Sequence, residues 1–574
     1  MRIQALMKIL AAAALGAQGL AAPPNAPVSP AHGVNSSSTV ARVASASYLV
    51  QAADFRLAVA AVKKAGGRVT HELGIINAVA ATLTPAQANA LRMDHRLTLT
   101  PNGMAAVAGT NAPVQPYIVE HTQANFLHAS GITGKGVTIA FLDTGWWSQH
   151  ATQTNIAGQN VVLQGYDATN AKGTVGVGAP SDQYGHGTHV LSIAANSAVA
   201  EDGTYIGMAP DAARVIVRAF DKNGQGSYAN VIQGIQWILN NAATYNIRVV
   251  NMSFGAKPQS FYWQDPLDQA VMQLWKAGIV VVASAGNGGP GAQSITAPGN
   301  VPYVITVGAM TDNYTPNTAS DDYLDSFSST GPTYEGFVKP EIVAPGGHVI
   351  GVLQNSSTIG KKYPQFLGTN GYLGSSYFYM SGTSMSAAVV SGTVALMLQA
   401  TPNLTPDQVK CKLMSSAQPA VSGSGALAYT VFQQGAGQIN AYNAVFNQNL
   451  ACANVGLNIA ADIAGTQHFM GPARQNASGQ FYVVDQNGNT IGGQGYLWNN
   501  SYALGPQGYL WNNGYLWNNG YLWNNGYLWN NGYLWNNGYL WNNGYLWNNG
   551  YLWNQSAAAP VTSPAAINSW VAQE

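Results

Sequence analysis

The sequence predicts an α/β protein built on a mainly parallel β-sheet with helices on both faces. Between about residues 115 and 450, short runs rich in Val and Ile alternate with segments of helical pattern. Near-continuous apolar runs indicate strands that are buried on both faces, as in parallel sheets covered by helices. The expected strands are 137–143, 213–220, 248–254, 278–286 and 301–309, and the helices between them include 228–242 and 265–277.

A smaller α+β unit is expected before this sheet, at residues 46–105. Its first strand, 47–52, alternates apolar and polar side chains and is followed by a helix and then by two strands within 68–84. Residues 84–87 (TPAQ) form a capping box that opens a second helix, and a last strand follows. The order of strand, helix, two strands, helix and strand predicts a ferredoxin-like unit.

The N-terminus predicts export. Arg2 and Lys8 form a basic region, and the apolar run after them ends in small residues before Pro23, so residues 1–22 read as a cleaved signal peptide. A membrane anchor is the alternative, but the run is shorter than the roughly 20 residues of a spanning helix. No later segment is expected to be long and apolar enough to span. Residues 23–45 are Pro- and Ser-rich and are expected to be a linker.

The composition suits a secreted, extracellular protein. Lys+Arg and Asp+Glu both number 23 in 574 residues, and only 8% of the residues are charged, against about 25% in a typical soluble protein. A chain without net charge gives no reason to expect nucleic-acid binding. In an exported chain the two cysteines, Cys411 and Cys452, are expected to form a disulfide at the end of a domain, with two isolated buried thiols as the alternative.

Three segments of the α/β region carry groups for nucleophilic catalysis. Asp143 ends a strand, where ligands of open α/β sheets bind, and His186, flanked by glycines, opens an apolar helix. Ser384 stands at the start of an Ala-rich helix, whose N-terminus offers free N–H groups. Amide hydrolysis by serine needs a base, a carboxylate that orients the base, and donors for the oxyanion. The side-chain amide of Asn287 and the backbone N–H of Ser384 could be those donors.

The segments around these residues, Asp-Thr-Gly, His-Gly-Thr-His and Gly-Thr-Ser-Met-Ser-Ala, occur in the chain order of the subtilisin family of serine peptidases, which the sequence resembles across residues 115–450. The resemblance includes NMSFG, SAGN, FSSTGP, KPEIVAPG and GAGQINAYNAV. It implies a three-layer α/β sandwich and a serine endopeptidase with Asp143, His186 and Ser384 as its triad and Asn287 in its oxyanion hole.

The same resemblance separates Ser384 from its neighbours. Ser386 lies two residues further along a helix and points away from Ser384, while Ser381 and Ser391 are expected in a turn and in helix packing. His189, nearly one helical turn after the expected base, is expected to be a packed and hydrogen-bonded side chain.

The resemblance also implies how substrates bind. Two segments are expected to wall a deep apolar slot, which predicts a preference for large apolar or aromatic P1 residues, those directly before the scissile bond. An edge at 224–226 is expected to pair with the substrate backbone as an added strand, although each glycine there could be an ordinary turn. The expected residues are Ser253, Phe254 and Gly255, then Ser284, Ala285 and Gly286, and at the edge Gly224 and Gly226.

The unit at 46–105 resembles the family's propeptide, which acts as an intramolecular inhibitor and is removed autocatalytically. No cofactor is expected for catalysis. Structural calcium is possible, but the matching stretch 195–210 departs from the family, so its ligands are not assigned beyond Glu201 and Asp202 as candidates. An aromatic-rich insertion at 353–380 could shape the rim of the cleft or be a surface loop.

The C-terminal part is repetitive. After a connecting region at 451–494, GYLWNN hexapeptides fill much of 495–555, and a tail at 556–574 ends the sequence. Stacked aromatic residues in a narrow β-solenoid could contact carbohydrate or a cell surface. A low-complexity segment without a ligand is the alternative.

Two other functions are weighed against a secreted endopeptidase that cleaves proteins or peptides. A sedolisin-type acid peptidase would carry Glu in place of His186 and Asp in place of Asn287. A surface adhesin would use the aromatic repeats and keep an inactive peptidase domain as a scaffold. The complete set of expected catalytic residues, together with the propeptide-like unit, favours the peptidase.

Overall fold

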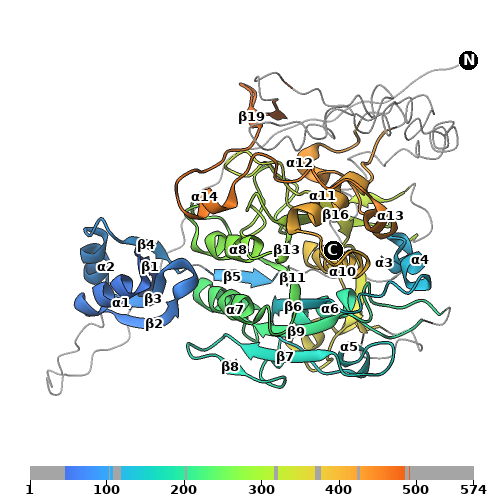
Figure 1. The fold of residues 1–574 in the computed structure, drawn as a ribbon, viewed down its shortest axis with the longest axis horizontal. Helices are drawn as coiled ribbons and strands as arrows, with labels where there is room; N and C mark the ends of the chain where they lie inside the picture. Colours follow the sequence, from blue (N-terminus) through green and yellow to red (C-terminus); the bar gives the residue numbers. More distant parts are fainter. Residues whose placement is uncertain are drawn as a thin grey trace, which may run out of the picture. The chain divides into compact units, whose positions relative to one another are not determined.

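The computed structural model describes residues 45–102, 104–107, 118–200, 203–315, 321–368, 377–422, 427–484 and 490 (Figure 1). The chain divides into two units, 1–44 and 45–574, and every described residue belongs to the second. The expected signal peptide, almost all of the linker, the GYLWNN repeats and the tail lie outside the described residues.

A nine-stranded sheet forms the centre of the larger domain. Its order is β15-β14-β13-β11-β6-β9-β7-β8, with β16 also paired to β14, and only the outer β15 and β8 run antiparallel to their neighbours. The strands are β6 (Thr138–Asp143), β7 (Val162–Asp167), β8 (Thr174–Val175), β9 (Ala213–Arg218), β11 (Ile247–Met252), β13 (Val280–Ser284), β14 (Ile305–Thr311), β15 (Tyr323–Leu324) and β16 (Ile342–Pro345).

Helices cover both faces of this sheet, which makes the three-layer sandwich that the sequence predicts. Helix α6 (His186–Ala194) packs against α10 (Thr383–Ala400), and α10 contacts β11, β13 and β14. Helix α7 (Tyr228–Asn241) packs against α8 (Pro266–Lys276), and these two contact β9 and β13 respectively (Figure 1). Every residue of β6 and β13 is buried, as a strand between two helical layers must be.

Helix α10 corrects one expectation. It is long and apolar enough to cross a membrane, with a mean hydropathy of 1.3, although no such segment was expected after the N-terminus. Its window is 89% buried inside the fold. The apolar composition therefore reflects its place in the core, where it packs against the sheet and α6.

The α+β unit has the expected connectivity. Its sheet order is β2-β3-β1-β4, and all neighbours are antiparallel. The capping box forms, since Gln87 N donates to Thr84 Oγ1 (3.3 Å) and Thr84 N donates to Gln87 Oε1 (2.8 Å). The elements are β1 (Ala46–Gln51), α1 (Phe55–Lys64), β2 (Arg68–Leu73), β3 (Ala78–Leu83), α2 (Pro85–Arg92) and β4 (Thr98–Pro101).

The two faces of this small sheet are buried differently, as alternation along its strands requires. Val50 and Val79 face the unit's own helices, whereas Leu49 and Ala80 join the core cluster of the larger domain. The second face lies against α7 and α8. The small unit thus covers helices of the larger domain with apolar side chains.

The remaining elements surround the sheet and complete the C-terminal side. Cys411 in α11 is bonded to Cys452. The described part of the connecting region, 451–484, packs on the larger domain. In it, buried Asp462 accepts hydrogen bonds from the hydroxyls of Tyr262 (2.6 Å) and Tyr303 (2.9 Å). These elements are η1 (Gly74–Ile76), α3 (Ile118–His121), α4 (Ala124–Ala129), α5 (His150–Gln153), β17 (Val349–Val352), α9 (Thr358–Lys362), η2 (Pro364–Phe366), β18 (Tyr377–Met380), α11 (Pro406–Ser416), α12 (Val431–Gln434), α13 (Ala441–Phe446), α14 (Ile459–Ile463), β19 (Ala473–Gln475) and β20 (Phe481–Val483).

Candidate active site

Asp143 and His186 meet at the carboxyl end of the central sheet. Asp143 is the last residue of β6 and His186 is the first residue of α6, and His186 Nδ1 lies 2.7 Å from Asp143 Oδ1. Both side chains are 1% exposed. Their approach depends on Gly187, because a Cβ at that position would lie 2.5 Å from the carbonyl oxygen of Gly145. Any larger residue would push α6 away from the loop that follows Asp143.

The carboxylate fixes the state of the imidazole. Asp143 Oδ1 accepts from His186 Nδ1 and from the backbone N–H of Thr144, both at 2.7 Å. Because the carboxylate oxygen accepts the hydrogen bond, it favours the imidazole tautomer that carries its proton on Nδ1. Nε2 is then the atom that can take a proton. Among the described residues, Asp143 Oδ2 has no hydrogen-bond partner and is buried. The arrangement can therefore stabilise an imidazolium by charge and orientation.

Ser384 is the second residue of α10, and α10 packs against α6, the helix that begins at His186. Ser384 and His186 therefore both lie at the N-terminal ends of neighbouring helices. The Ser384 hydroxyl donates to the carbonyl of Ser253 (3.0 Å), and Ser253 Oγ donates to the carbonyl of Ser384 (2.8 Å). Asn251 Nδ2 in turn donates to Ser253 Oγ (2.9 Å). These contacts hold the first turn of α10 against the segment that follows β11.

The neighbouring polar side chains are occupied elsewhere, in agreement with their expected structural roles. Ser386 donates to a backbone carbonyl, Ser391 donates to Asn251 Oδ1, and Ser381 accepts a backbone N–H. His189 is fully buried and its Nε2 donates to a backbone carbonyl at 2.9 Å. Burial lowers the pKa of His189 to about 3, so this ring is neutral at ordinary pH.

Asn287 presents a side-chain amide beside the nucleophile helix. Its Oδ1 accepts from both the backbone N–H (3.0 Å) and the hydroxyl (2.8 Å) of Thr383, the residue directly before Ser384. Among the described residues, the buried Nδ2 of Asn287 has no acceptor. An oriented and unpaired donor is what a developing oxyanion requires.

Sequence reasoning missed Thr383 as the residue that orients this amide. Thr383 Oγ1 also accepts the backbone N–H of Gly286 at 3.2 Å, which ties α10 to the loop that carries Asn287. The available signal was a hydroxyl side chain directly before Ser384. Its partner, however, is distant in sequence, so the motif alone does not reveal the contact.

An extended segment already occupies the expected substrate edge. Strand β5 (Met104–Val107) lies between β10 (Gln225–Ser227) and β12 (Phe254–Gly255) and runs antiparallel to both. Gly226 is inside β10, and Gly224 precedes it in a turn with φ +72°. Backbone pairing on both sides is how a peptide substrate would be held in this groove.

The two segments expected to wall the specificity pocket face a common side chain, Thr296, which was not singled out from the sequence. A Cβ at Gly255 would lie 2.2 Å from Thr296 Oγ1, and one at Gly286 would lie 2.8 Å from Thr296 Cγ2. Thr296 therefore stands between the two walls and reduces the space between them.

The other wall residues are buried and join the segments together. Ser284 Oγ donates to the carbonyl of Phe254 (3.1 Å), and Ala285 is fully buried. The Phe254 ring packs against Phe220, with 5.0 Å between ring centroids.

A calcium site was expected only as a possibility. Within the described ranges, no group of three or more His, Cys, Asp or Glu side chains is arranged to hold a metal ion. The candidates Glu201 and Asp202 lie outside those ranges.

Residues 134–440, more than half of the 574-residue chain, match the subtilase family. The serine protease AprX of Bacillus subtilis is 38% identical over 339 residues, which are 57% of this chain and 70% of AprX. Subtilisin E of Bacillus subtilis is 30% identical over 358 residues, which are 62% of this chain and 79% of that relative.

A solved structure shows the same fold. Fervidolysin from Fervidobacterium pennivorans, a keratinolytic enzyme related to subtilisin, superimposes with a TM-score of 0.54 at 23% sequence identity. The match covers 79% of this chain but 65% of fervidolysin, so the chain spans less than two thirds of that protein's length.

Proposed function

The chain belongs to the subtilase family and is a serine endopeptidase, and from this premise we propose that Asp143, His186 and Ser384 form its catalytic triad. His186 Nε2 takes the Ser384 proton as Oγ bonds to the substrate carbonyl carbon. The same imidazolium then protonates the leaving nitrogen as the C–N bond breaks. Water, deprotonated by His186, next releases the acyl group and restores the Ser384 hydroxyl. The observation that carries this proposal is the buried 2.7 Å contact between His186 and Asp143.

The direct test is hydrolysis of a quenched peptide with Leu at P1 by the purified chain. We expect cleavage, and its complete loss after treatment with a serine-directed phosphonylating reagent. Cleavage that survives this reagent would exclude a serine nucleophile.

The Asn287 side chain is proposed to stabilise the oxyanion together with the backbone N–H of Ser384. Replacing Asn287 by Ala should lower kcat about 10²- to 10³-fold with little change in KM, because the donor acts only on the transition state. Thr383→Val should produce a smaller loss in kcat, since it removes one of the two hydrogen bonds that orient the amide and keeps the backbone one. Steady-state kinetics on the Leu peptide measures both. An unchanged kcat for the Asn287 variant would remove this residue from the oxyanion site.

We propose that the P1 pocket lies between the segments at Ser253–Gly255 and Ser284–Gly286 and accepts large apolar side chains, with Thr296 setting its depth. Thr296→Gly should raise kcat/KM for Phe relative to Leu at P1 about threefold or more, because it removes side-chain volume between Gly255 and Gly286. Comparing the Phe:Leu ratio with that of Ser294→Gly, a nearby control in the same loop, measures the effect. Equal ratios in wild type and Thr296→Gly would place the pocket elsewhere.

We also propose that the protein is exported and that its α+β unit is an inhibitory propeptide. The position of β5 between β10 and β12 supports the inhibitory role, because a strand in the substrate groove blocks other peptides. Autocatalytic cleavage is expected after Val107 and before Ile118. No cofactor is proposed for catalysis, and contact of the GYLWNN repeats with carbohydrate or a cell surface stays a prediction.

A further inference from the structure

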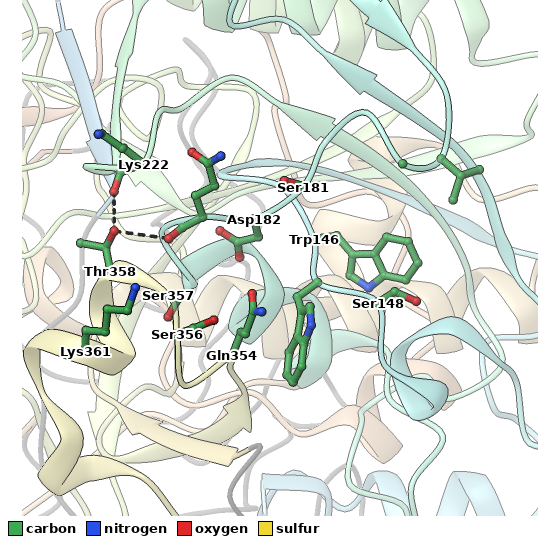
Figure 2. Close-up of a pocket in the computed structure, with 14 residues that line it drawn as sticks. Trp146, Ser148, Ser181, Asp182, Lys222, Gln354, Ser356, Ser357, Thr358 and Lys361 are labelled. Atoms are coloured by element: carbon green, nitrogen blue, oxygen red, sulfur yellow. Dashed lines mark hydrogen bonds between the residues drawn. The ribbon is translucent and has the colours of Figure 1, made fainter.

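A cavity of about 700 Å³ is lined in part by the loops that follow Asp143 and precede His186 (Figure 2). One wall comes from the loop after Asp143 and carries Trp146 and Trp147, and a second comes from the loop that leads to His186. The third wall is the inserted segment around Ser357 and Lys361. Figure 2 shows Lys222, Thr358 and Lys361 on one side of this cavity and Trp146 with Ser148 on the other.

The inserted segment is fastened to the catalytic loops. Thr358 Oγ1 donates to the carbonyls of Lys222 (2.8 Å) and Gln183 (3.3 Å), and Thr358 N also donates to Gln183 (3.0 Å). Ser357 packs on Gly185, where a Cβ would lie 2.7 Å from Ser357 Oγ and where φ is +109°. The wall is therefore a fixed part of the fold, directly beside His186.

The polar lining of the cavity is positively charged. Asp182 is its one acidic side chain, but Oδ1 accepts from Thr144 Oγ1 and from the backbone N–H groups of Tyr184 and Gly185, and Oδ2 accepts from the N–H and hydroxyl of Thr188. These donors satisfy the carboxylate inside the protein. Lys222 and Lys361 are exposed, so their ammonium groups remain to attract an anion.

The carboxylate next to Lys222 in the sequence, that of Asp221, is hydrogen-bonded within its own turn. It accepts from the backbone N–H groups of Asn223 (2.8 Å) and Gln225 (3.0 Å). Only 8% of the chain is charged, so two lysines in one cavity beside the catalytic loops are a local concentration of positive charge.

The opposite wall is aromatic and mostly buried. Trp146 is 6% exposed and its Nε1 donates to Thr152 Oγ1 at 3.2 Å, while Trp147 is half-buried. Indole rings on one side and ammonium groups on the other suit a ligand with an aliphatic stem and a terminal carboxylate. Glutamate, and aspartate with a shorter stem, have this chemistry.

One residue of the cavity wall is close in sequence to the proposed substrate edge. Lys222 is in the turn that leads into β10, and β10 pairs with an extended segment through its backbone. We propose that this cavity is an accessory subsite that binds an acidic side chain of the peptide substrate. The inference rests on the proposed function, because its ligand is part of the peptide being cleaved.

The test uses matched quenched peptides with Leu at P1 and either Glu or Gln at one position, varied over the three residues on each side of the scissile bond. In the wild type, at least one position should give a Glu:Gln ratio of kcat/KM of about two to five, the size expected for exposed charge pairs. That ratio should fall toward one in the double variant Lys222→Gln, Lys361→Gln, and in 0.5 M salt, which screens the charges.

Lys276→Gln, an exposed lysine at the end of α8 and outside the cavity, is the control and should keep the wild-type ratio. The absence of any position that favours Glu would overturn the proposal. So would a Glu:Gln ratio that survives in the double variant, or one that the control lowers equally. If the subsite proposal alone is wrong, the Gln peptides are still cleaved. If the proposed peptidase mechanism is wrong, neither the Glu nor the Gln peptides are cleaved, and both proposals are contradicted.

Discussion

Replacing Ser384 by Ala is expected to abolish peptide cleavage and to leave the protein at its unprocessed length. The hydroxyl is the proposed nucleophile, so its loss should lower kcat by about 10⁴-fold or more and leave only what binding and the oxyanion donors contribute. The same loss should stop autocatalytic removal of the α+β unit. Peptide hydrolysis and the N-terminal sequence of the purified protein, expressed in a host that lacks extracellular proteases, measure the two effects.

Ser386→Ala is the matched control, because Ser386 lies in the same turn of α10 and donates only to the carbonyl of Ala344. This variant should be processed and should cleave the Leu peptide. If hydrolysis were retained in Ser384→Ala and lost in Ser386→Ala, the nucleophile would be Ser386 and not Ser384. Normal processing of Ser384→Ala alone would show that another protease matures the chain.

Replacing Asp143 by Asn is expected to lower kcat about 10⁴-fold while the protein stays folded. The Asn side chain has nearly the same shape and can fill the same space, but it carries no charge to stabilise the imidazolium. Its amide can also donate to His186 and favour the tautomer that lacks a proton on Nδ1. Because the 2.7 Å contact joins two groups that are each 1% exposed, water cannot replace the lost interaction.

Asp221→Asn removes a carboxylate from a nearby turn and should leave kcat within about twofold of the wild type, since this group makes only local contacts. Thermal unfolding of both variants separates folding from catalysis. An Asp143→Asn protein that unfolds like the wild type and keeps its full kcat would contradict the proposed role of this carboxylate.

The central sheet could be predicted closely because its signal is local. Continuous apolar runs mark β6 and β13, and both lie within the predicted ranges. The strand predicted at 301–309 instead begins at Ile305. The apolar run starts earlier, but Pro302 has no N–H to donate to a neighbouring strand, so buried side chains there do not imply pairing.

The positions of Asp143, His186 and Ser384 could also be predicted, since each stands in a distinctive segment at the end of a strand or the start of a helix. The residues that sequence reasoning missed act across long separations. Thr383 meets Asn287 only when α10 packs beside the loop after β13, and Thr296 faces glycines of two other segments. Contacts between residues so far apart in the sequence leave no local pattern from which they could be predicted.

Labelling of the mature protein with a serine-directed phosphonylating reagent, followed by mass spectrometry of its peptides, would identify the nucleophile itself. We expect one reagent molecule per chain, attached to Ser384, and a loss of peptidase activity in proportion to the labelled fraction. Labelling of a different serine, or full activity in a protein stoichiometrically labelled at Ser384, would contradict this expectation.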